Sequence, residues 1–401
     1  MKAQGPKLKA QEKLQIQNSN GRPRCSKTFA LHFGVWSFGL LLSFELWIFS
    51  IFLFAPSNHA RAEGSARITR EAVLRDTVGK VIAPACQELL ARSRDLTNAL
   101  GGLSRSSSAD ALTQARQAWT AAMLAARVVQ GYEAGPLTDR DAATAFLYSQ
   151  ILLGRITGVL NSSRPLTATY VEELGSPAKG LFALEHLLFG PKTMDTGAAK
   201  AGSSADMLTS PQGPRLVEYL QALARDLEAR AAQVAGDWSA ADGATKKFIA
   251  GGQESINTLV NQLAMHLEVA TENRLGFVLR LPEPITRQYQ RVECSPSGAS
   301  RQSVRALISG IERHYSGGDG AGLDDLVNQL NPSLARRIEA QFTVTLSALD
   351  ALAAPLEDAG VKDRAALQRA YDKARALEIL FKVDLASTLG VTITFGTNDG
   401  D

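Results

Sequence analysis

A single acidic side chain lies within an otherwise apolar stretch, "SPAKGLFALEHLLFGPK", residues 176–192. The spacing predicts a helix, and the positions three and four residues away from Glu185 are all apolar: Leu181, Phe182, Leu188 and Phe189. A helix that is apolar on almost every side is usually buried, so we expect Glu185 to face other parts of the protein. A buried carboxylate must pair with a cation, bind a metal or take up a proton. Glu185 is therefore either half of a structural ion pair with an arginine, or a ligand or acid–base group.

No histidine has the spacing needed to share a metal ion with Glu185. His186 follows it directly and points about 100° away around the helix, whereas a helical metal pair needs a spacing of three or four residues. The position three residues before Glu185 is Phe182, and the chain has no H-E-x-x-H motif. His266 lies among apolar residues of a predicted helix, which is typical of a core or interface side chain. His314 lies at a helix end, where a cation complements the helix dipole.

Two further groups of residues carry side chains that could bind a metal ion or take part in catalysis. The terminal sequence N-D-G-D places Asp399, Asp401 and the chain carboxylate close together. Such oxygen donors suit Fe³⁺, Ca²⁺ or Mn²⁺, and the alternative is a frayed acidic tail. Ser300 has no histidine or lysine placed by a motif as its base, so the pattern does not predict a serine hydrolase. Ser300 and Arg305 could instead be a helix N-cap and a partner for Glu185.

The first 62 residues differ in character from the rest of the chain. They hold eight Lys/Arg against two acids, and since the whole chain carries +3, the remainder is mildly acidic and has no footprint for nucleic acid. Residues 29–55 are almost wholly apolar, and Ala60-Arg61-Ala62 has the pattern of a signal-peptidase site. We interpret residues 1–62 as a signal peptide and leader, with Glu63 as the first mature residue. The alternative is an uncleaved anchor, the one route by which the protein would touch a membrane. Both interpretations export the body to the periplasm or cell envelope.

Two cysteines remain after this cleavage, Cys86 and Cys294. In an oxidising compartment a lone pair of this kind is a candidate disulfide. The alternative is two buried thiols. No C-x-x-C motif or Cys/His cluster predicts a zinc site.

The mature sequence predicts an all-α protein with two helical-bundle domains. Apolar residues recur at helical spacing in every long segment, and the expected helices cover residues 68–100 (with a kink or break at Pro84), 108–131, 138–160, 176–190 (capped by Ser176), 214–235, 245–272, 300–315, the segment that starts at Asn331, and 363–388. Residues 391–395, "VTITF", are the one predicted strand. Residues 196–213 lack periodicity and are predicted to link an N-terminal bundle, 63–195, to a C-terminal bundle, 214–401.

Several blocks of this sequence together resemble the imelysin family of bacterial envelope proteins. The stretch "KGLFALEHLLFG" resembles the family pattern G-x-H-x-x-E at Gly180 and Glu185, with Phe182 in place of the histidine. Other matching blocks contain Trp119, Gly135 and Pro136 in the first half, Ser297, Gly298, Ser300 and Arg305 in "SPSGASRQSVRALISGIE", and the terminus "LGVTITFGTNDGD". The resemblance implies two all-helical domains with the motif helix near their interface, and a link to iron-regulated uptake. It also implies a metallopeptidase label, which the missing histidine weakens for this chain.

Three hypotheses follow for function. The first is a non-catalytic periplasmic protein that binds a metal ion (iron or another divalent ion) or a metal-bearing partner, such as an envelope metal-uptake component. Glu185 would be the central acid, with Ser300 and Arg305 lining the site and Asp399 and Asp401 as further candidate ligands. The second is a metallopeptidase, and the third is a structural envelope module in which Glu185 forms an ion pair. Acids or imidazoles around Glu185 favour the first two hypotheses, whereas an arginine alone favours the third.

Overall fold

Helices make up the regular structure of every part of the chain that can be described. The computed structural model describes residues 67–105, 108–131, 146–190, 204–239, 243–282, 291–352 and 355–394. Within these ranges there are helices and no strand, which confirms the predicted all-α fold. Residues 391–394 of the predicted strand have no regular structure, and there the side chain of Asn261 donates to the carbonyl of Thr392 and accepts from the N–H of Thr394. Phe395 lies outside the described residues. The predicted leader, residues 1–62, lies outside the described residues.

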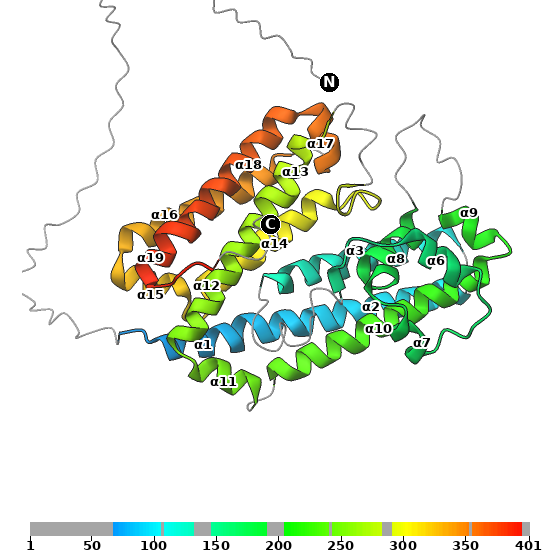
Figure 1. Cartoon of the computed structure of the whole chain (residues 1–401), viewed down its shortest axis with the longest axis horizontal. Coiled ribbons are helices and arrows are strands. Elements are labelled where there is room, and N and C mark those ends of the chain that lie inside the picture. Colours follow the sequence, from blue (N-terminus) through cyan, green and yellow to red (C-terminus); the bar gives the residue numbers. More distant parts are fainter. Residues whose placement is uncertain are drawn as a thin grey trace, which may run out of the picture. The chain divides into compact units, whose positions relative to one another are not determined.

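One group of helices is built around two long neighbours, and it consists of α1 (Arg70–Asp76), α2 (Ala83–Arg105), α3 (Ala109–Gln130), α10 (Gly213–Ser239) and α11 (Ala244–Ala250). α2 packs along both α3 and α10 (Figure 1). Of the kink or break predicted at Pro84, the break is wrong, because the chain stays helical through this residue. Pro84 has no N–H to donate to the preceding turn, and that turn belongs to a π-helical segment, Thr77–Ile82, which joins α1 to α2.

Four shorter helices pack at one end of this group: α6 (Leu153–Leu160), α7 (Ala168–Glu173), α8 (Gly180–Phe189) and α9 (Ser204–Thr209). Of the predicted helix 138–160, residues 146–147 and 153–160 are helical, the latter as α6, and residues 138–145 lie outside the described residues. Residues 148–152 are not helical, and there the backbone N–H of Leu152 donates to the carbonyl of Pro177 at 2.9 Å. The N–H of Leu152 thus donates to a distant segment instead of to a carbonyl in a preceding helical turn.

A second group of helices follows, and it consists of α12 (Gln253–Glu268), α13 (Phe277–Arg280), α14 (Ser300–Ser316), α15 (Leu323–Leu330), α16 (Pro332–Asp350), α17 (Leu356–Lys362), α18 (Arg364–Ile379) and α19 (Ala386–Leu389). Two π-helical segments, Val269–Gly276 and Leu380–Leu385, connect α12 to α13 and α18 to α19. The rings of Tyr315, Phe342 and Phe381 meet in the core of this group with centroids 5.6 to 5.9 Å apart.

The two groups meet where α14 packs against α3 (Figure 1). The backbones approach closely there because Gly310 has no side chain: a Cβ at this position would lie 2.8 Å from the carbonyl oxygen of Val128. This close packing brings Arg127 of α3 next to Ser303 of α14. The two groups are therefore joined through a tight helix crossing.

The division between the groups does not fall at the predicted linker, residues 196–213. α10 follows that segment, yet it packs along α2, which precedes it. The division comes after α10 and α11, and residues Gly64–Asp401 form one compact unit. Among the described residues, no helix combines the length and the apolar character needed to cross a membrane.

The predicted disulfide between Cys86 and Cys294 is absent, and both residues are free, buried thiols. Cys86 lies on α2, and Cys294 lies in the turn before α14. Burial raises the pKa of each thiol to about 12, so both remain protonated at neutral pH. The disulfide was predicted because these are the two cysteines that remain after cleavage, and their positions in the sequence do not specify the distance between them.

Candidate functional site

The helix that carries Glu185 is fixed at two points by side chains of α3. The indole Nε1 of Trp119 donates to the carbonyl of Leu181 at 2.8 Å, and Nε of Arg116 donates to the carbonyl of Leu188 at 2.8 Å. α8 begins at Gly180, whose φ of +77° favours glycine, and the predicted cap Ser176 belongs instead to a separate 3₁₀ turn, Ser176–Ala178. Trp119, one of the residues singled out by resemblance, thus positions α8.

Glu185 is buried, with 3 % of its surface exposed, as its apolar neighbours predicted. Its Oε1 accepts two hydrogen bonds from Ser297, one from the backbone N–H at 3.1 Å and one from the hydroxyl at 2.6 Å. Burial raises the pKa of this carboxyl to about 7, although the Ser297 bonds and the nearby Arg127 charge act in the opposite direction. The Glu185 carboxyl therefore takes up a proton at a higher pH than a solvated glutamate does.

Ser297 reaches Glu185 because the chain turns sharply just before α14. Cys294 has a φ of +58°, which is uncommon for a residue with a side chain, and Gly298 has a φ of +71°. The N–H of Ala299 donates to the carbonyl of Cys294 at 3.0 Å and closes the turn. This turn directs both the backbone N–H and the hydroxyl of Ser297 toward one oxygen of Glu185.

A cluster of two buried arginines and a half-buried glutamate lies beside this carboxyl. Arg127 of α3 is 1 % exposed, and its guanidinium donates to Ser303 at 2.9 Å, Gln130 at 2.8 Å and Glu293 at 2.7 Å. Arg274 donates to the same Oε2 of Glu293 through Nε at 3.0 Å and Nη2 at 2.9 Å. Burial raises the pKa of Glu293, but the two guanidinium groups outweigh it and hold the pKa at about 2. Glu293 is therefore an anion shared by two cations.

The arginine next to Glu185 also occupies the region of the missing motif histidine. The guanidinium carbon of Arg127 lies 5.5 Å from the centroid of the Phe182 ring, which is a cation–π contact. Phe182 stands where the G-x-H-x-x-E pattern has its histidine. A positive charge therefore lies beside the position from which a helical His/Glu pair would hold a metal.

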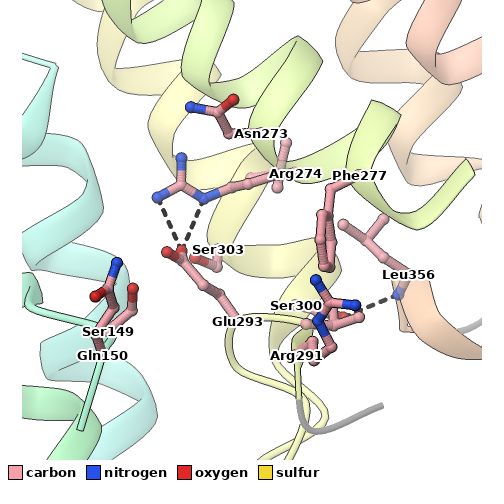
Figure 2. A pocket seen from close by; sticks show the side chains of 12 residues that line it. Ser149, Gln150, Asn273, Arg274, Phe277, Arg291, Glu293, Ser300, Ser303 and Leu356 are labelled. Carbon is pink, nitrogen blue, oxygen red and sulfur yellow. Dashed lines mark hydrogen bonds and ion pairs between the residues drawn. The ribbon is translucent and has the colours of Figure 1, made fainter. Parts of the chain in front are cut away.

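Glu185 opens onto a cavity of about 390 Å³. Its walls include Phe182, His186, Glu293 and apolar side chains such as Ile151 and Leu153. A second cavity of about 310 Å³ adjoins it and is shown in Figure 2. The two cavities share five wall residues: Ser149, Gln150, Arg291, Val292 and Glu293. The non-helical segment 148–152 thus supplies part of the wall between α8 and α14.

The structure separates the predicted site residues into three sets. Ser300 lies in the second cavity, where its hydroxyl donates to Glu357 at 2.6 Å and accepts from the backbone N–H of Leu356 at 2.9 Å. Arg305 is exposed and pairs with Asp350 at 2.6 Å and 3.0 Å, so the expectation that it lines the site or partners Glu185 is wrong. Gly135, Pro136, Asp399 and Asp401 lie outside the described residues.

The described side chains do not form a site for a bare metal ion. His266 and His314 are both buried on α12 and α14, and His314 Nδ1 lies 3.4 Å from the carbonyl of Gly131. In the described ranges, no group of three or more His, Cys, Asp or Glu side chains could hold a metal ion. Glu185 and His186 are the candidate donors in the larger cavity, and Glu293 is engaged by two arginines.

The comparisons with known proteins agree with the all-helical fold. Residues 82–381 match the family Imelysin, peptidase family M75, and the chain belongs to this family. A crystal structure of a putative iron-regulated protein A precursor from Parabacteroides distasonis has a TM-score of 0.69 at 18 % identity, with 81 % of this chain and 97 % of that chain covered. An imelysin-like protein from Psychrobacter arcticum gives a TM-score of 0.64 at 18 % identity, with the same coverage. No curated protein matches the chain.

Sequence reasoning did not identify the charge cluster of Arg127, Arg274 and Glu293. A signal for Arg127 was present, since it follows Trp119 and Met123 at four-residue intervals and therefore lies on the buried face of the same helix. An arginine on such a face must have a buried partner. No comparable spacing connects Arg274 and Glu293, because they lie on different segments that meet only in the folded chain.

Proposed function

We propose that this protein is an exported, non-catalytic member of the imelysin family that binds a metal-bearing ligand in the cavity beside Glu185. The ligand would serve iron or metal acquisition in the cell envelope. The observation that carries the proposal is the state of Glu185, a buried carboxyl with a pKa of about 7 that faces a cavity. Ser297 holds Oε1, and Oε2 accepts no hydrogen bond from the described residues, so Oε2 is the oxygen left to a ligand.

The surroundings of Glu185 argue against the structural ion pair. Arg127 is close enough to lower the pKa of Glu185, yet its donors go to Ser303, Gln130 and Glu293. The hydrogen bonds to Glu185 come instead from the uncharged Ser297. An acid kept for stability alone would gain more from a direct pair with the buried cation. His186 and Glu293 line the same cavity, which is the arrangement expected for a binding site.

The same surroundings favour a ligand that brings its own metal donors over a bare ion. Phe182 removes the motif histidine, and the Arg127 charge over its ring repels a second cation. A hydrolytic zinc site needs about three protein ligands and a water near a base. Glu185 and His186 point to different sides of α8 and do not supply such a set. Binding without hydrolysis fits these residues better.

Two observations support export and a role in metal acquisition. The basic leader, the apolar run and Ala60-Arg61-Ala62 have the order of a secretory signal. The similar Parabacteroides distasonis protein is described as an iron-regulated protein A precursor. Fractionation of cells that express the full chain tests export, and full-length protein in the soluble cytoplasm would contradict it.

Isothermal titration calorimetry of the mature protein, residues 63–401, tests the binding site. The probes are ferric citrate, citrate alone, and the chlorides of Zn²⁺ and Mn²⁺. We expect ferric citrate to bind, and Glu185→Gln to weaken it roughly tenfold because a charge-assisted contact is lost. The matched control is Glu173→Gln, since Glu173 is an exposed glutamate paired with Arg164, and it should bind as the wild type does. No binding of ferric citrate, or equal binding by both variants and the wild type, would overturn the proposal.

A peptidase assay tests the competing function that the family name suggests. We expect purified mature protein not to cleave unstructured peptides in the presence of Zn²⁺, Mn²⁺ or Fe²⁺. Cleavage that is lost with a chelator and with Glu185→Ala, but retained through extensive purification, would show that the protein is a metallopeptidase.

A further inference from the structure

The second cavity combines buried positive charge with an apolar wall. Its lining includes the side chains of Arg274, Arg291 and Glu293 and the apolar residues Phe277, Val292, Val304 and Leu356. In Figure 2 the charged groups of Arg274 and Glu293 face each other, with Phe277 and Leu356 on another side of the space. Arg291, Val292 and Glu293 also line the cavity at Glu185, whereas Arg274, Phe277, Val304 and Leu356 belong to the second cavity alone.

Arg274 has donor capacity that the protein does not use. Its side chain is 8 % exposed, and its Nε and Nη2 donate to one oxygen of Glu293. Its Nη1 is buried and has no hydrogen-bond partner among the described residues. Figure 2 shows this third nitrogen directed away from Glu293, toward the side on which Asn273 lies. Buried guanidinium donors are normally satisfied, so an unpaired one at a cavity wall indicates a missing acceptor.

The charge balance around the cavity points to the same missing group. Arg274 and Arg127 share the single carboxylate of Glu293. Arg291 is an exposed cation at the rim, held with its guanidinium carbon 5.4 Å from the centroid of the Phe277 ring. Two buried cations therefore share one carboxylate, and an anion bound at Nη1 of Arg274 would supply a second negative charge.

We propose that this cavity is a binding site for a small organic carboxylate. The carboxylate would accept from Nη1 of Arg274 and lie within reach of Arg291, and both are guanidinium groups, which match the planar geometry of a carboxylate. The volume of about 310 Å³ suits a small molecule. The wall of Phe277, Val292, Val304 and Leu356 would cover its carbon skeleton, and this wall favours an organic anion over inorganic phosphate. The proposal does not depend on metal-ligand binding at Glu185.

Calorimetric titration of metal-free mature protein with succinate, and in parallel with inorganic phosphate, tests this site. We expect succinate to bind more tightly than phosphate. Arg274→Gln should weaken succinate binding roughly tenfold or more, because a buried charge-assisted contact disappears. Arg274 also holds Glu293, so the Arg274→Gln variant could fail to fold. Arg291→Gln at the exposed rim is therefore the second variant, and it should weaken binding about threefold, as a partly solvated contact would.

Arg305→Gln is the matched control, because Arg305 lies on α14 near the cavity but is exposed and pairs with Asp350. It should bind succinate as the wild type does. No succinate binding by the wild type, or equal affinity in the Arg291→Gln and Arg305→Gln variants, would overturn the proposal. Phosphate binding as tight as succinate binding would overturn the assignment of an organic ligand. Ferric citrate binding that is weakened in Glu185→Gln while succinate binding remains would show that the two ligands occupy separate sites.

Discussion

Replacing Glu185 by glutamine should make the protein more stable at high pH, and the pH dependence is the sharpest test of how this carboxyl is buried. Burial raises its pKa from 4.5 to about 7. Between these values the folded protein keeps the proton while the unfolded chain has lost it, so the wild type loses stability as the pH rises from about 4.5 to about 7. The total loss is about 3 kcal/mol, at 1.36 kcal/mol for each unit of pKa shift. A glutamine side chain stays neutral and keeps an oxygen for Ser297, so the Glu185→Gln variant avoids this loss.

Urea unfolding of the wild type and the Glu185→Gln variant at pH 5 and pH 8 measures the effect. The difference in unfolding free energy between variant and wild type should grow by about 2.5 kcal/mol from pH 5 to pH 8, because part of the loss has already occurred at pH 5. Glu173→Gln, at an exposed position, should show no such growth. Ser297→Ala should raise the pKa of Glu185 further, since it removes the hydroxyl bond to Oε1. Parallel pH profiles for wild type and Glu185→Gln would refute the reasoning about the buried carboxyl.

Three further outcomes are expected. Phe182→His restores the spacing of three residues to Glu185, so Zn²⁺ affinity measured by calorimetry should rise, and unchanged affinity would indicate that the nearby arginine charge dominates. Trp119→Phe leaves the buried carbonyl of Leu181 without its donor and should lower the unfolding free energy by about 1–3 kcal/mol in urea, whereas a change below the error of the measurement would show that α8 is held by packing alone. Cys86 and Cys294 should both react with a thiol reagent in urea without reductant, and both should resist it in the native state. If neither thiol reacts in urea, the two cysteines form a disulfide after all.

The sequence predicted those features that depend on local periodicity. The burial of Glu185 followed from its four apolar helical neighbours, and the helices around it followed from spacing. Periodicity also places Arg305 on a different side of α14 from Ser300. Arg305 follows Ser300 by five residues and so lies about 140° around the helix from it, while Ser303 and Val304 are on the buried side.

The partners of Glu185 could not be predicted in this way. Ser297 lies 112 residues further along the chain, and its position depends on a turn in which Cys294 has an unusual positive φ. The break at residues 148–152 is also a tertiary effect, because Leu152 exchanges a helical partner for the carbonyl of Pro177. Periodicity predicts which face of a helix is buried and contains no information about which distant segment covers it.

Glu293 lines both cavities, and its charge acts on ionisable groups in each of them. Its negative charge raises the pKa of Glu185, while Arg127 lowers it. A carboxylate bound beside Arg274 would add negative charge to the same cluster, so the pKa of Glu185 would rise further and its proton would be held to higher pH. By reciprocity, protonation of Glu185 would strengthen binding of the carboxylate. The replacement of the motif histidine by Phe182 fits this arrangement, because the face of the phenyl ring contacts the Arg127 cation. The negative charges that balance this cation are then those of Glu185, Glu293 and any anion that binds next to them.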